Sequence, residues 1–342
     1  AKQDKVYKFR MANWYPPGSS FNAAIWPFYA EQLKKASNGR IDIKVFPAEQ
    51  LVKEADTWEA VVDGIADIGH VFLMDESGRF PLTEYGFLPM LWPNNRTASI
   101  VMTSLYEKYP ALQNEFKDVH VLFFNINAPA QLFTKNKKVS TKEDFAGLKI
   151  QGGGLYFKYI AKQLGFTPVS FTFPEVYDAL SKGTVDGNTV EWEGQYIWKW
   201  YEQTNYSLGG VNLYAFPFVL AMNKGKWDSL PDDIKQVFNQ YSGVKGAEMC
   251  GSVFDSYDDA SKMMIEDYAK KNNKPAPERV SPAVKDEFEK LMAPVHEQWA
   301  ADMEKKGLPG NEVLEDAREL VRQIESGQNP LFWSAGELPV AK

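Results

Sequence analysis

Residues that build disulfides, zinc sites and membrane spans are scarce in this sequence. The 342 residues include a single cysteine, Cys250, so no disulfide can form within the chain. Three histidines, His70, His120 and His296, are far apart and lack the spacing of zinc ligands. The longest apolar runs fall well short of the ~18 residues that a membrane-spanning helix requires. We therefore expect no metal, no cofactor and no direct membrane insertion.

Positive charge is also in short supply. Lys and Arg number 38 against 45 Asp and Glu, which gives a formal net charge of −7. The chain has no lysine block or basic stripe of the kind that binds nucleic acid or an anionic membrane surface, so we expect no nucleic-acid partner. It also starts without a basic-then-apolar leader. Ala1-Lys2-Gln3 is typical of a mature end after signal-peptide removal, or of an artificial boundary.

Aromatic residues, in contrast, are abundant. They make up 14% of the chain and include ten tryptophans. A chain of this length exceeds one ordinary hydrophobic core and fits two lobes. We expect most of the rings in these cores, and the remainder can line a binding pocket.

The first third of the chain alternates between strand and helix patterns. Hydrophobic periodicity predicts strands and helices in turn at 7–14, 21–37, 41–46, 55–63 and 67–73. This order predicts a mostly parallel sheet covered by helices, in the α/β class.

Part of this pattern recurs later in the chain. Residues 60–67 and 179–186 share a layout of helix end, glycine and a strand that opens with aspartate. Two α/β lobes of similar build would give this repeat. Chance similarity is the alternative, because helix–glycine–strand sequences are common.

Longer elements follow. Residues 119–127, 131–135 and 216–223 have strand patterns and are expected to cross between the lobes. A helical stretch over 231–271 is expected to be interrupted at its glycines, namely Gly243, Gly246 and Gly251. An amphipathic helix over 284–306 and a last helix from Asn311 are expected before an irregular tail.

Four blocks of sequence, in this order, carry a family resemblance. They are Asp67-Ile68-Gly69 with Phe80-Pro81-Leu82 and Leu88-Pro89; Gly147-Leu148-Lys149-Ile150; Gly165, Pro168, Glu175-Val176-Tyr177, Ala179-Leu180, Gly183 and Val185-Asp186-Gly187; and Phe218 to Asn223 with Trp227-Asp228-Ser229-Leu230-Pro231. Any one block alone is weak, but all four in order cover most of the chain. Together they resemble the solute-binding subunits of tripartite ATP-independent periplasmic (TRAP) transporters, of the dicarboxylate-binding DctP-like family.

The resemblance implies a two-lobed periplasmic binding protein with crossing strands, a long lobe-bridging helix and a C-terminal helical extension. Residues 1–128 plus about 215–250 would form one lobe, 129–214 plus about 251–310 the other, and 311–342 the last helix and tail. A small solute would close the lobes, and the closed form would dock on a TRAP membrane permease in the periplasm. We expect a monomer, with a dimer through the C-terminal helix as the alternative.

The second lobe departs from the family pattern at the expected ligand anchor. The family usually has an arginine after the "GLKI" block, where its two-pronged guanidinium grips a carboxylate, but this chain has Gln151. Gln131 stands where the sialic-acid-binding branch has a second arginine. Further along, Val190 replaces a polar asparagine and is followed by Glu191, Trp192 and Glu193. The resemblance therefore implies a cleft that has lost positive charge.

The first lobe adds a run of charged residues at the same cleft. The resemblance places Glu76 and Arg79 there, and Asp75 adds a second carboxylate. The alternative is a solvated loop in which Arg79 pairs with Asp75 or Glu76. Rings that the family often uses to line the cleft stand at Trp14, Tyr15, Phe72, Tyr156, Phe173 and Trp192.

Rings combined with carboxylates suit a small cation, by ion pairing and cation–π contact. The hypothesis is a small amine or amino alcohol such as ethanolamine. The alternative is an organic acid or an aromatic, indole-type acid, held by Arg79 and by backbone amides at Gly152-Gly153-Gly154. A hydrolytic enzyme is a remote alternative, because the chain lacks the GxSxG, P-loop and HExxH motifs.

Overall fold

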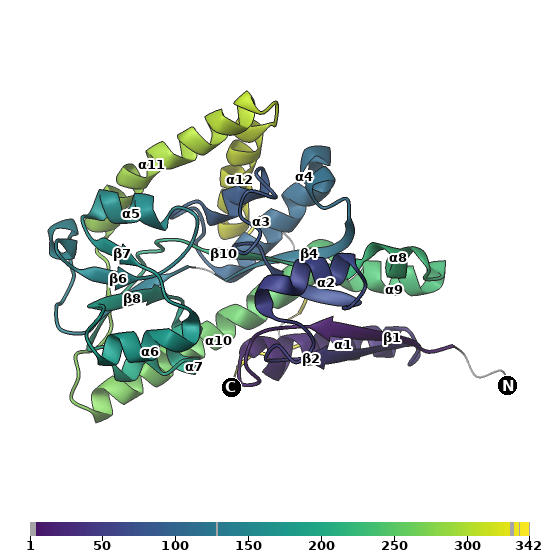
Figure 1. Ribbon diagram of the computed structural model, residues 1–342, viewed down its shortest axis with the longest axis horizontal. Helices are drawn as coiled ribbons and strands as arrows, with labels where there is room; N and C mark the ends of the chain where they lie inside the picture. Colours follow the sequence, from purple (N-terminus) through teal and green to yellow (C-terminus); the bar gives the residue numbers. More distant parts are fainter. Residues whose placement is uncertain (1–4, 128, 329–331, 335, 342) are drawn as a thin grey trace.

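Two separate β-sheets, each flanked by helices, form the two lobes of the molecule (Figure 1). The computed structural model describes residues 5–127, 129–328, 332–334 and 336–341. The expectation for Ala1-Lys2-Gln3 lies outside these residues. The predicted α/β class and two-lobed architecture are confirmed. Among the residues described, no helix combines the length and apolar character needed to cross a membrane.

The first lobe is built on a five-stranded sheet of order β2-β1-β3-β10-β4. Its first three strands run parallel, and β10 is inserted antiparallel between β3 and β4. The strands are β1 Tyr7–Ala12, β2 Ile41–Phe46, β3 Ile68–Phe72, β4 Val119–Asn127 and β10 Phe216–Asn223. Their helical partners are η1 Phe21–Ile25, α1 Trp26–Ala36, η2 Glu54–Asp56, α2 Thr57–Val62, η3 Thr83–Phe87, α3 Asn95–Lys108, α4 Pro110–Glu115, α8 Lys224–Asp228 and α9 Asp232–Tyr241.

The second lobe has a six-stranded sheet of order β11-β9-β5-β8-β6-β7. Here β6 lies parallel to both β7 and β8, while β5 is antiparallel to its neighbours. The strands are β5 Gln131–Thr134, β6 Lys149–Gln151, β7 Thr167–Val169, β8 Gly187–Val190, β9 Tyr206–Gly209 and β11 Glu278–Arg279. The helices are η4 Lys142–Phe145, α5 Phe157–Leu164, α6 Phe173–Ser181, α7 Trp192–Ile197 and η5 Trp200–Glu202.

The repeat found in the sequence corresponds to the same strand-end contact in both lobes. The Asp67 carboxylate accepts a hydrogen bond from the backbone N–H of Arg10 at 2.7 Å, and the Asp67 N–H donates to the Arg10 carbonyl at 3.0 Å. In the second lobe Asp186 exchanges the same two bonds with Lys149, both at 2.8 Å. Each aspartate therefore fixes the start of one strand against its parallel neighbour.

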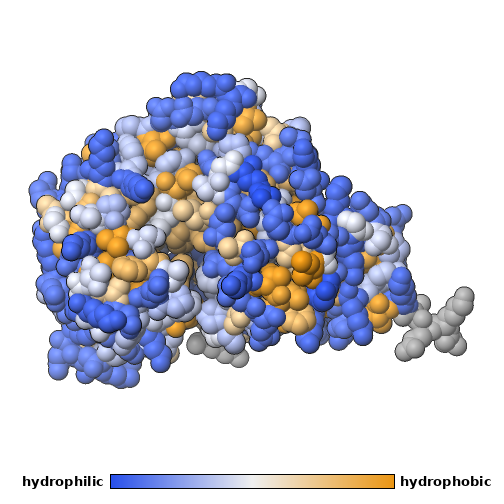
Figure 2. All heavy atoms as spheres, viewed as in Figure 1, coloured by the Kyte–Doolittle hydropathy of each residue, from blue (hydrophilic) through white to orange (hydrophobic). Residues whose placement is uncertain are grey.

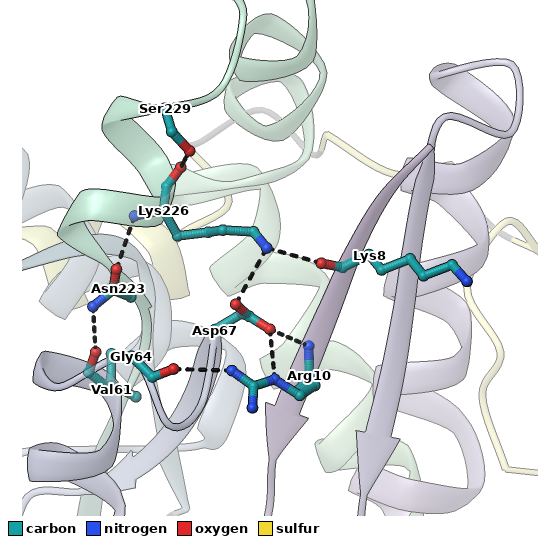
Figure 3. A network of polar contacts seen from close by, with 8 residues as sticks. All are labelled: Lys8, Arg10, Val61, Gly64, Asp67, Asn223, Lys226 and Ser229. Atoms are coloured by element: carbon teal, nitrogen blue, oxygen red, sulfur yellow. Dashed lines mark hydrogen bonds and ion pairs between the residues drawn. The ribbon is translucent and has the colours of Figure 1, made fainter. Parts of the chain in front are cut away.

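The first lobe extends this contact into a network (Figure 3). Lys226 Nζ lies 3.2 Å from the Asp67 carboxylate and donates to the Lys8 carbonyl at 3.0 Å. The Asn223 side chain accepts from the Lys226 N–H at 2.8 Å and donates to the Val61 carbonyl at 2.8 Å. Residues of the first and fourth sequence blocks thus tie β10, α2 and β1 together, which is a structural role.

A single long helix, α10 (Gly243–Lys271), lies against both lobes (Figure 1). It packs on α3 and β4 of the first lobe and on α7 of the second. The helix runs through Gly246 and Gly251 without the expected interruptions. A Cβ atom at Gly251 would lie 2.5 Å from the Arg96 Cα on α3, so this glycine permits close helix packing rather than a bend.

The C-terminal helices return the chain to the first lobe. Helix α11 (Pro282–Lys305) contacts α5, and α12 (Gly310–Glu325) packs on α3. The apolar face of α12 is buried there, at Val313, Leu314, Ala317 and Ile324. The lobe boundaries predicted from the sequence stay a prediction. The boundary expected between residues 250 and 251 falls within α10, which is continuous there.

The close approach of α10 to α3 can be tested with Gly251→Ala. Alanine normally favours a helix over glycine, by about 1 kcal/mol. At this position the added methyl group meets backbone atoms of α3, so we expect a loss of about 1–3 kcal/mol of unfolding free energy in urea titrations. The exposed Lys270→Ala on the same helix should change stability by less than about 0.5 kcal/mol. A gain in stability for Gly251→Ala would contradict the described packing.

Candidate ligand-binding cleft

A cavity of about 570 Å³ lies between the two lobes, a size that suits a small-molecule ligand. In Figure 2 the surface is hollowed between the lobes. Most of its lining comes from loops that follow parallel strands of the two sheets, which is where open α/β sheets usually bind ligands. The lining residues after β1, β2 and β3 are Trp14, Pro16, Ala48, Glu49, Glu54, Met74 and Asp75. Those after β6 and β7 are Gly152, Gly153, Gly154, Ser170, Phe171, Thr172, Phe173 and Pro174.

Aromatic rings connect the two walls of the cavity. Trp14 of the first lobe has its ring centroid 5.8 Å from that of Phe173 of the second lobe. Behind them, Trp14 is 6.4 Å from Phe72, and Phe173 stacks on Trp200 at 5.6 Å. Four further rings complete the apolar lining, namely Phe171, Trp198, Tyr214 and Phe216. The cavity therefore offers flat ring faces from both lobes.

The ionised side chains of the lining are acidic. Glu49, Glu54 and Asp75 line the cavity, and the described lining contains no Lys, Arg or His. Burial, followed by the nearby carboxylates of Asp75 and Glu49, raises the pKa of Glu54 to about 8. Burial also raises the pKa of Asp75 above its ordinary value. The carboxyl groups of Glu54 and Asp75 consequently hold their protons more tightly than they would in water.

Gln151 lies at the end of β6 and lines the cavity from the second lobe, with 5% of its surface exposed. Its side-chain oxygen is buried without a hydrogen-bond partner among the described residues. The backbone at Gly152 packs closely against Thr189 of β8, since a Cβ at Gly152 would lie 2.3 Å from Thr189 Oγ1. The next amide, that of Gly153, donates to the Tyr214 hydroxyl at 3.3 Å. This wall presents neutral polar groups.

Arg79 and Glu76 lie outside the cavity lining, although the sequence places them at the cleft. Arg79 Nη2 lies 2.6 Å from the Glu59 carboxylate, and Nε lies 2.7 Å from that of Glu76. The guanidinium also stands 5.6 Å from the Trp58 ring. The local attraction of two carboxylates and a ring holds Arg79 on the surface, as in the solvated-loop alternative, with Glu76 and not Asp75 as its partner.

Three other predicted residues pack behind the cleft or at the hinge. Tyr15 stacks under Trp14 at 4.0 Å, and its hydroxyl accepts from the Asn127 side chain at 2.6 Å. Trp192 meets Phe133 edge-on at 5.0 Å. The Gln131 side chain accepts from the backbone N–H of Gly210 at 2.6 Å and donates to the Pro129 carbonyl at 2.8 Å. Tyr156 also lies outside the lining and packs against the core of the first lobe.

Glu191 and Glu193 are buried at the junction of the lobes rather than in the cavity lining. The Glu193 carboxylate accepts from the N–H and the hydroxyl of Ser20, at 2.6 and 2.8 Å. Its own backbone N–H donates to the Asp258 carboxylate on α10 at 2.8 Å. Burial raises the pKa of both glutamates to about 7. The two carboxyl groups therefore lie at the junction of the lobes and do not face the cavity.

The model of bacterial extracellular solute-binding proteins, family 7, matches residues 12–302. The chain belongs to this family. Its relatives include the C4-dicarboxylate-binding periplasmic protein DctP of Rhodobacter capsulatus, which is 26% identical over 277 residues, 79% of this chain and 77% of the relative.

Solved structures give the same result. A TRAP solute-binding protein from Rhodoferax ferrireducens T118, in complex with copurified benzoate, has a TM-score of 0.85 at 27% identity and covers 95% of this chain and 100% of its own. A marine metagenome TRAP protein specific for aromatic acid ligands, crystallised with 3-hydroxybenzoate, has a TM-score of 0.84 at 26% identity, covering 94% and 99%. This chain is thus a TRAP-type solute-binding receptor and not an enzyme. The resemblance predicted from its four sequence blocks is confirmed.

Several lining residues were missed from the sequence. Glu49 and Glu54 follow the predicted strand at 41–46, and the rule that ligand loops follow parallel strands would have singled out this segment. Trp198, Trp200 and Tyr214 carry no such signal, because they reach the cavity through folding of the second lobe. The replacement of the family's arginine by Gln151 stays a prediction.

The buried glutamates predict a pH-dependent stability. Burial raises the Glu191 pKa to about 7 in the folded chain, from 4.5 for a solvated glutamate. The folded state then holds the proton more tightly than the unfolded state. Its contribution is complete below pH 4.5 and is lost as the pH rises through about 7. We expect Glu191→Gln to reduce the fall in unfolding free energy between pH 5 and 8 by roughly 1–3 kcal/mol.

Urea unfolding at the two pH values measures this effect. The exposed Glu287→Gln serves as the matched control and should keep the wild-type pH dependence. A wild-type protein that is equally stable at pH 5 and pH 8, or a Glu191→Gln variant with an unchanged profile, would contradict the assignment.

Proposed function

We propose that this receptor captures a small aromatic acid between its lobes in the periplasm and delivers it to a TRAP membrane permease. The observation that carries the proposal is the set of rings on both walls of the cavity, with Trp14 and Phe173 meeting across it. Flat rings on two sides favour a flat ligand, since stacked and edge-on ring contacts add to the burial of apolar area. The relatives crystallised with benzoate and 3-hydroxybenzoate support an aromatic acid as this ligand.

A carboxylate can be held in this cleft without a cationic side chain. The second-lobe wall supplies the Gln151 side-chain amide and the Gly154 backbone N–H, for which the described residues offer no acceptor. The neighbouring Gly152 and Gly153 N–H groups donate to Val169 and Tyr214, and the Tyr214 hydroxyl donates to the Thr189 carbonyl. Hydrogen bonds from the Gln151 amide and the Gly154 N–H favour the charged form of a carboxylate. Because the pKa of Glu54 is about 8, this side chain is mostly protonated at pH 7 and adds little repulsion. Arg79 has no part in this proposal, since its guanidinium is paired on the surface.

A small amine, the hypothesis drawn from the sequence, is the second candidate. The observation that favours it is the acidic lining, with Glu49, Glu54 and Asp75 and no cationic side chain among the described lining residues. An ammonium group could pair with these carboxylates and lie over a ring. We rank it second because the related structures hold aromatic acids, and the many rings exceed what an ethanolamine-sized ligand would cover.

Delivery to the permease follows from closure of the lobes around the ligand. A ring bound against both Trp14 and Phe173 touches both lobes at once and so favours the closed form over the open form. No bond in the ligand needs to change. We propose that the monomer acts alone in this capture, since the apolar face of α12 is covered by its own chain.

A ligand series tests the proposed function. We expect benzoate to raise the melting temperature more than benzyl alcohol, benzylamine or ethanolamine, with about 2.7 kcal/mol of stabilisation at a concentration one hundred times its Kd. Phe173→Ala should weaken benzoate binding about tenfold, because one ring contact is lost. Arg79→Ala should leave the affinity within about twofold.

Isothermal titration calorimetry gives the affinities. Stabilisation by amines alone would reject the aromatic acid and favour the second candidate. A tenfold loss of benzoate affinity in Arg79→Ala would show that the surface arginine, rather than the neutral wall, holds the carboxylate.

A further inference from the structure

The two walls of the cleft differ in their chemistry. The carboxyl groups of the described lining, those of Glu49, Glu54 and Asp75, come from the first lobe. The second-lobe wall carries amide, hydroxyl, indole and backbone groups, with Gln151 and Tyr214 among them. A ligand that spans the cleft therefore meets hydrogen-bond acceptors or acids at one end and neutral polar groups at the other.

The side chains of Glu54 and Asp75 have no protein partner. Among the described residues, no hydrogen bond or ion pair engages either carboxyl group, in contrast to Glu76 and Glu59, which hold Arg79. A carboxyl group that is half-buried and lacks a partner is costly unless a ligand or a proton satisfies it. Glu54 is half-buried and lines the cavity, with the exposed Asp75 on the same wall. The Glu54 carboxyl group thus points to a ligand that brings a hydrogen-bond donor to the first-lobe wall.

The loop that carries Glu54 is held in place at some cost. Ala48 and Glu49 both have left-handed backbone conformations, with φ angles of 50° and 60°, which disfavour residues with a Cβ. The Ala48 N–H donates to the Tyr15 carbonyl at 3.0 Å, and the Glu49 carboxylate accepts from the Glu54 N–H at 2.9 Å. Glu49 is therefore a positioning residue, because its carboxylate is occupied by the backbone of Glu54 and leaves the Glu54 side chain available to the cavity.

We propose that the ligand is an aromatic acid that also carries a hydrogen-bond donor, a hydroxyl or a protonated amino group, at the end remote from its carboxylate, and that Glu54 and Asp75 select for this donor. The inference rests on the proposed function and refines its ligand class. The ring packs against Trp14 and Phe173, the carboxylate lies at the second-lobe wall, and the donor lies at the first-lobe carboxyl groups. Such a ligand satisfies both walls, whereas an unsubstituted acid leaves the first wall without a partner.

Matched ligand pairs test the selection. The titrations compare benzoates that carry a hydroxyl or an aminomethyl group at position 3 or 4 with donor-free analogues of matched size, the methyl compound for hydroxyl and the ethyl compound for aminomethyl. We expect the wild type to bind the best donor-bearing acid about 10- to 100-fold more tightly than its donor-free analogue, as for a hydrogen bond to a charged or acidic group. In Glu54→Ala and Asp75→Ala this preference should fall to within about threefold.

Control variants separate selection from folding. Glu59→Gln, an exposed glutamate of the same lobe that pairs with Arg79, should keep the full preference. Each variant should retain the wild-type far-ultraviolet circular dichroism spectrum, which shows that the fold is intact, and the preference is taken as a ratio of two affinities within the same variant. The variant Glu54→Gln distinguishes the donors, because an ammonium group draws Glu54 into its ionised form, which glutamine lacks, whereas a hydroxyl needs only an acceptor oxygen. It should retain much of the hydroxyl preference and lose the aminomethyl preference.

The outcomes separate this inference from the proposed function. If the donor-free analogues bind as tightly as the donor-bearing acids to the wild type, the selection is wrong while the aromatic-acid receptor stands. An undiminished preference in both Glu54→Ala and Asp75→Ala would likewise overturn it. If no benzoate of the series binds, the proposed function fails and this inference fails with it.

Discussion

The cleft depends on Glu193, whose polar groups join the first lobe, the second lobe and the long helix α10. Its carboxylate accepts two hydrogen bonds from Ser20 of the first lobe, while its backbone begins α7 of the second lobe and donates to Asp258 of α10. All three residues are buried. Removing one partner would leave a buried acidic group unsatisfied, at a cost of several kcal/mol. The distance between the walls of the cavity is thereby tied to a polar contact far from the ligand.

This arrangement explains why carboxyl groups in similar sequence contexts have different roles. Glu191 and Glu193 follow strand β8, as Glu54 follows β2, yet they lie in the hinge, whereas Glu54 lines the cavity. Between Glu193 and Glu54 the difference is whether a protein donor is available. Ser20 satisfies the Glu193 carboxylate, whereas no described residue satisfies the Glu54 side chain. Glu193 therefore contributes to structure, and Glu54 is left for a ligand or a proton.

The parts of the fold that depend on local pattern could be read from the sequence. Strands β4 and β10 have the bounds expected from their apolar runs, and the repeated aspartates, Asp67 and Asp186, hold equivalent strand ends. Contacts between distant segments could not be read. Nothing local marks Ser20 as the partner of Glu193, 173 residues away, or Gly251 as the site where α10 meets α3. Arg79 was assigned to the cleft by resemblance, but Glu59 and Glu76 hold it on the surface through short-range attraction.

The absence of a cationic side chain from the described lining limits which acids the cleft can hold. A ligand carboxylate beside ionised Glu54 and Asp75 would place like charges together, and these charges repel each other. The repulsion is removed if the acids take up protons, which their raised pKa values favour, or if the ligand brings its own donor to that wall. The amine expected from the sequence and the aromatic acid suggested by the relatives are then compatible. The donor of the ligand meets the first-lobe wall, and its carboxylate meets the second-lobe wall.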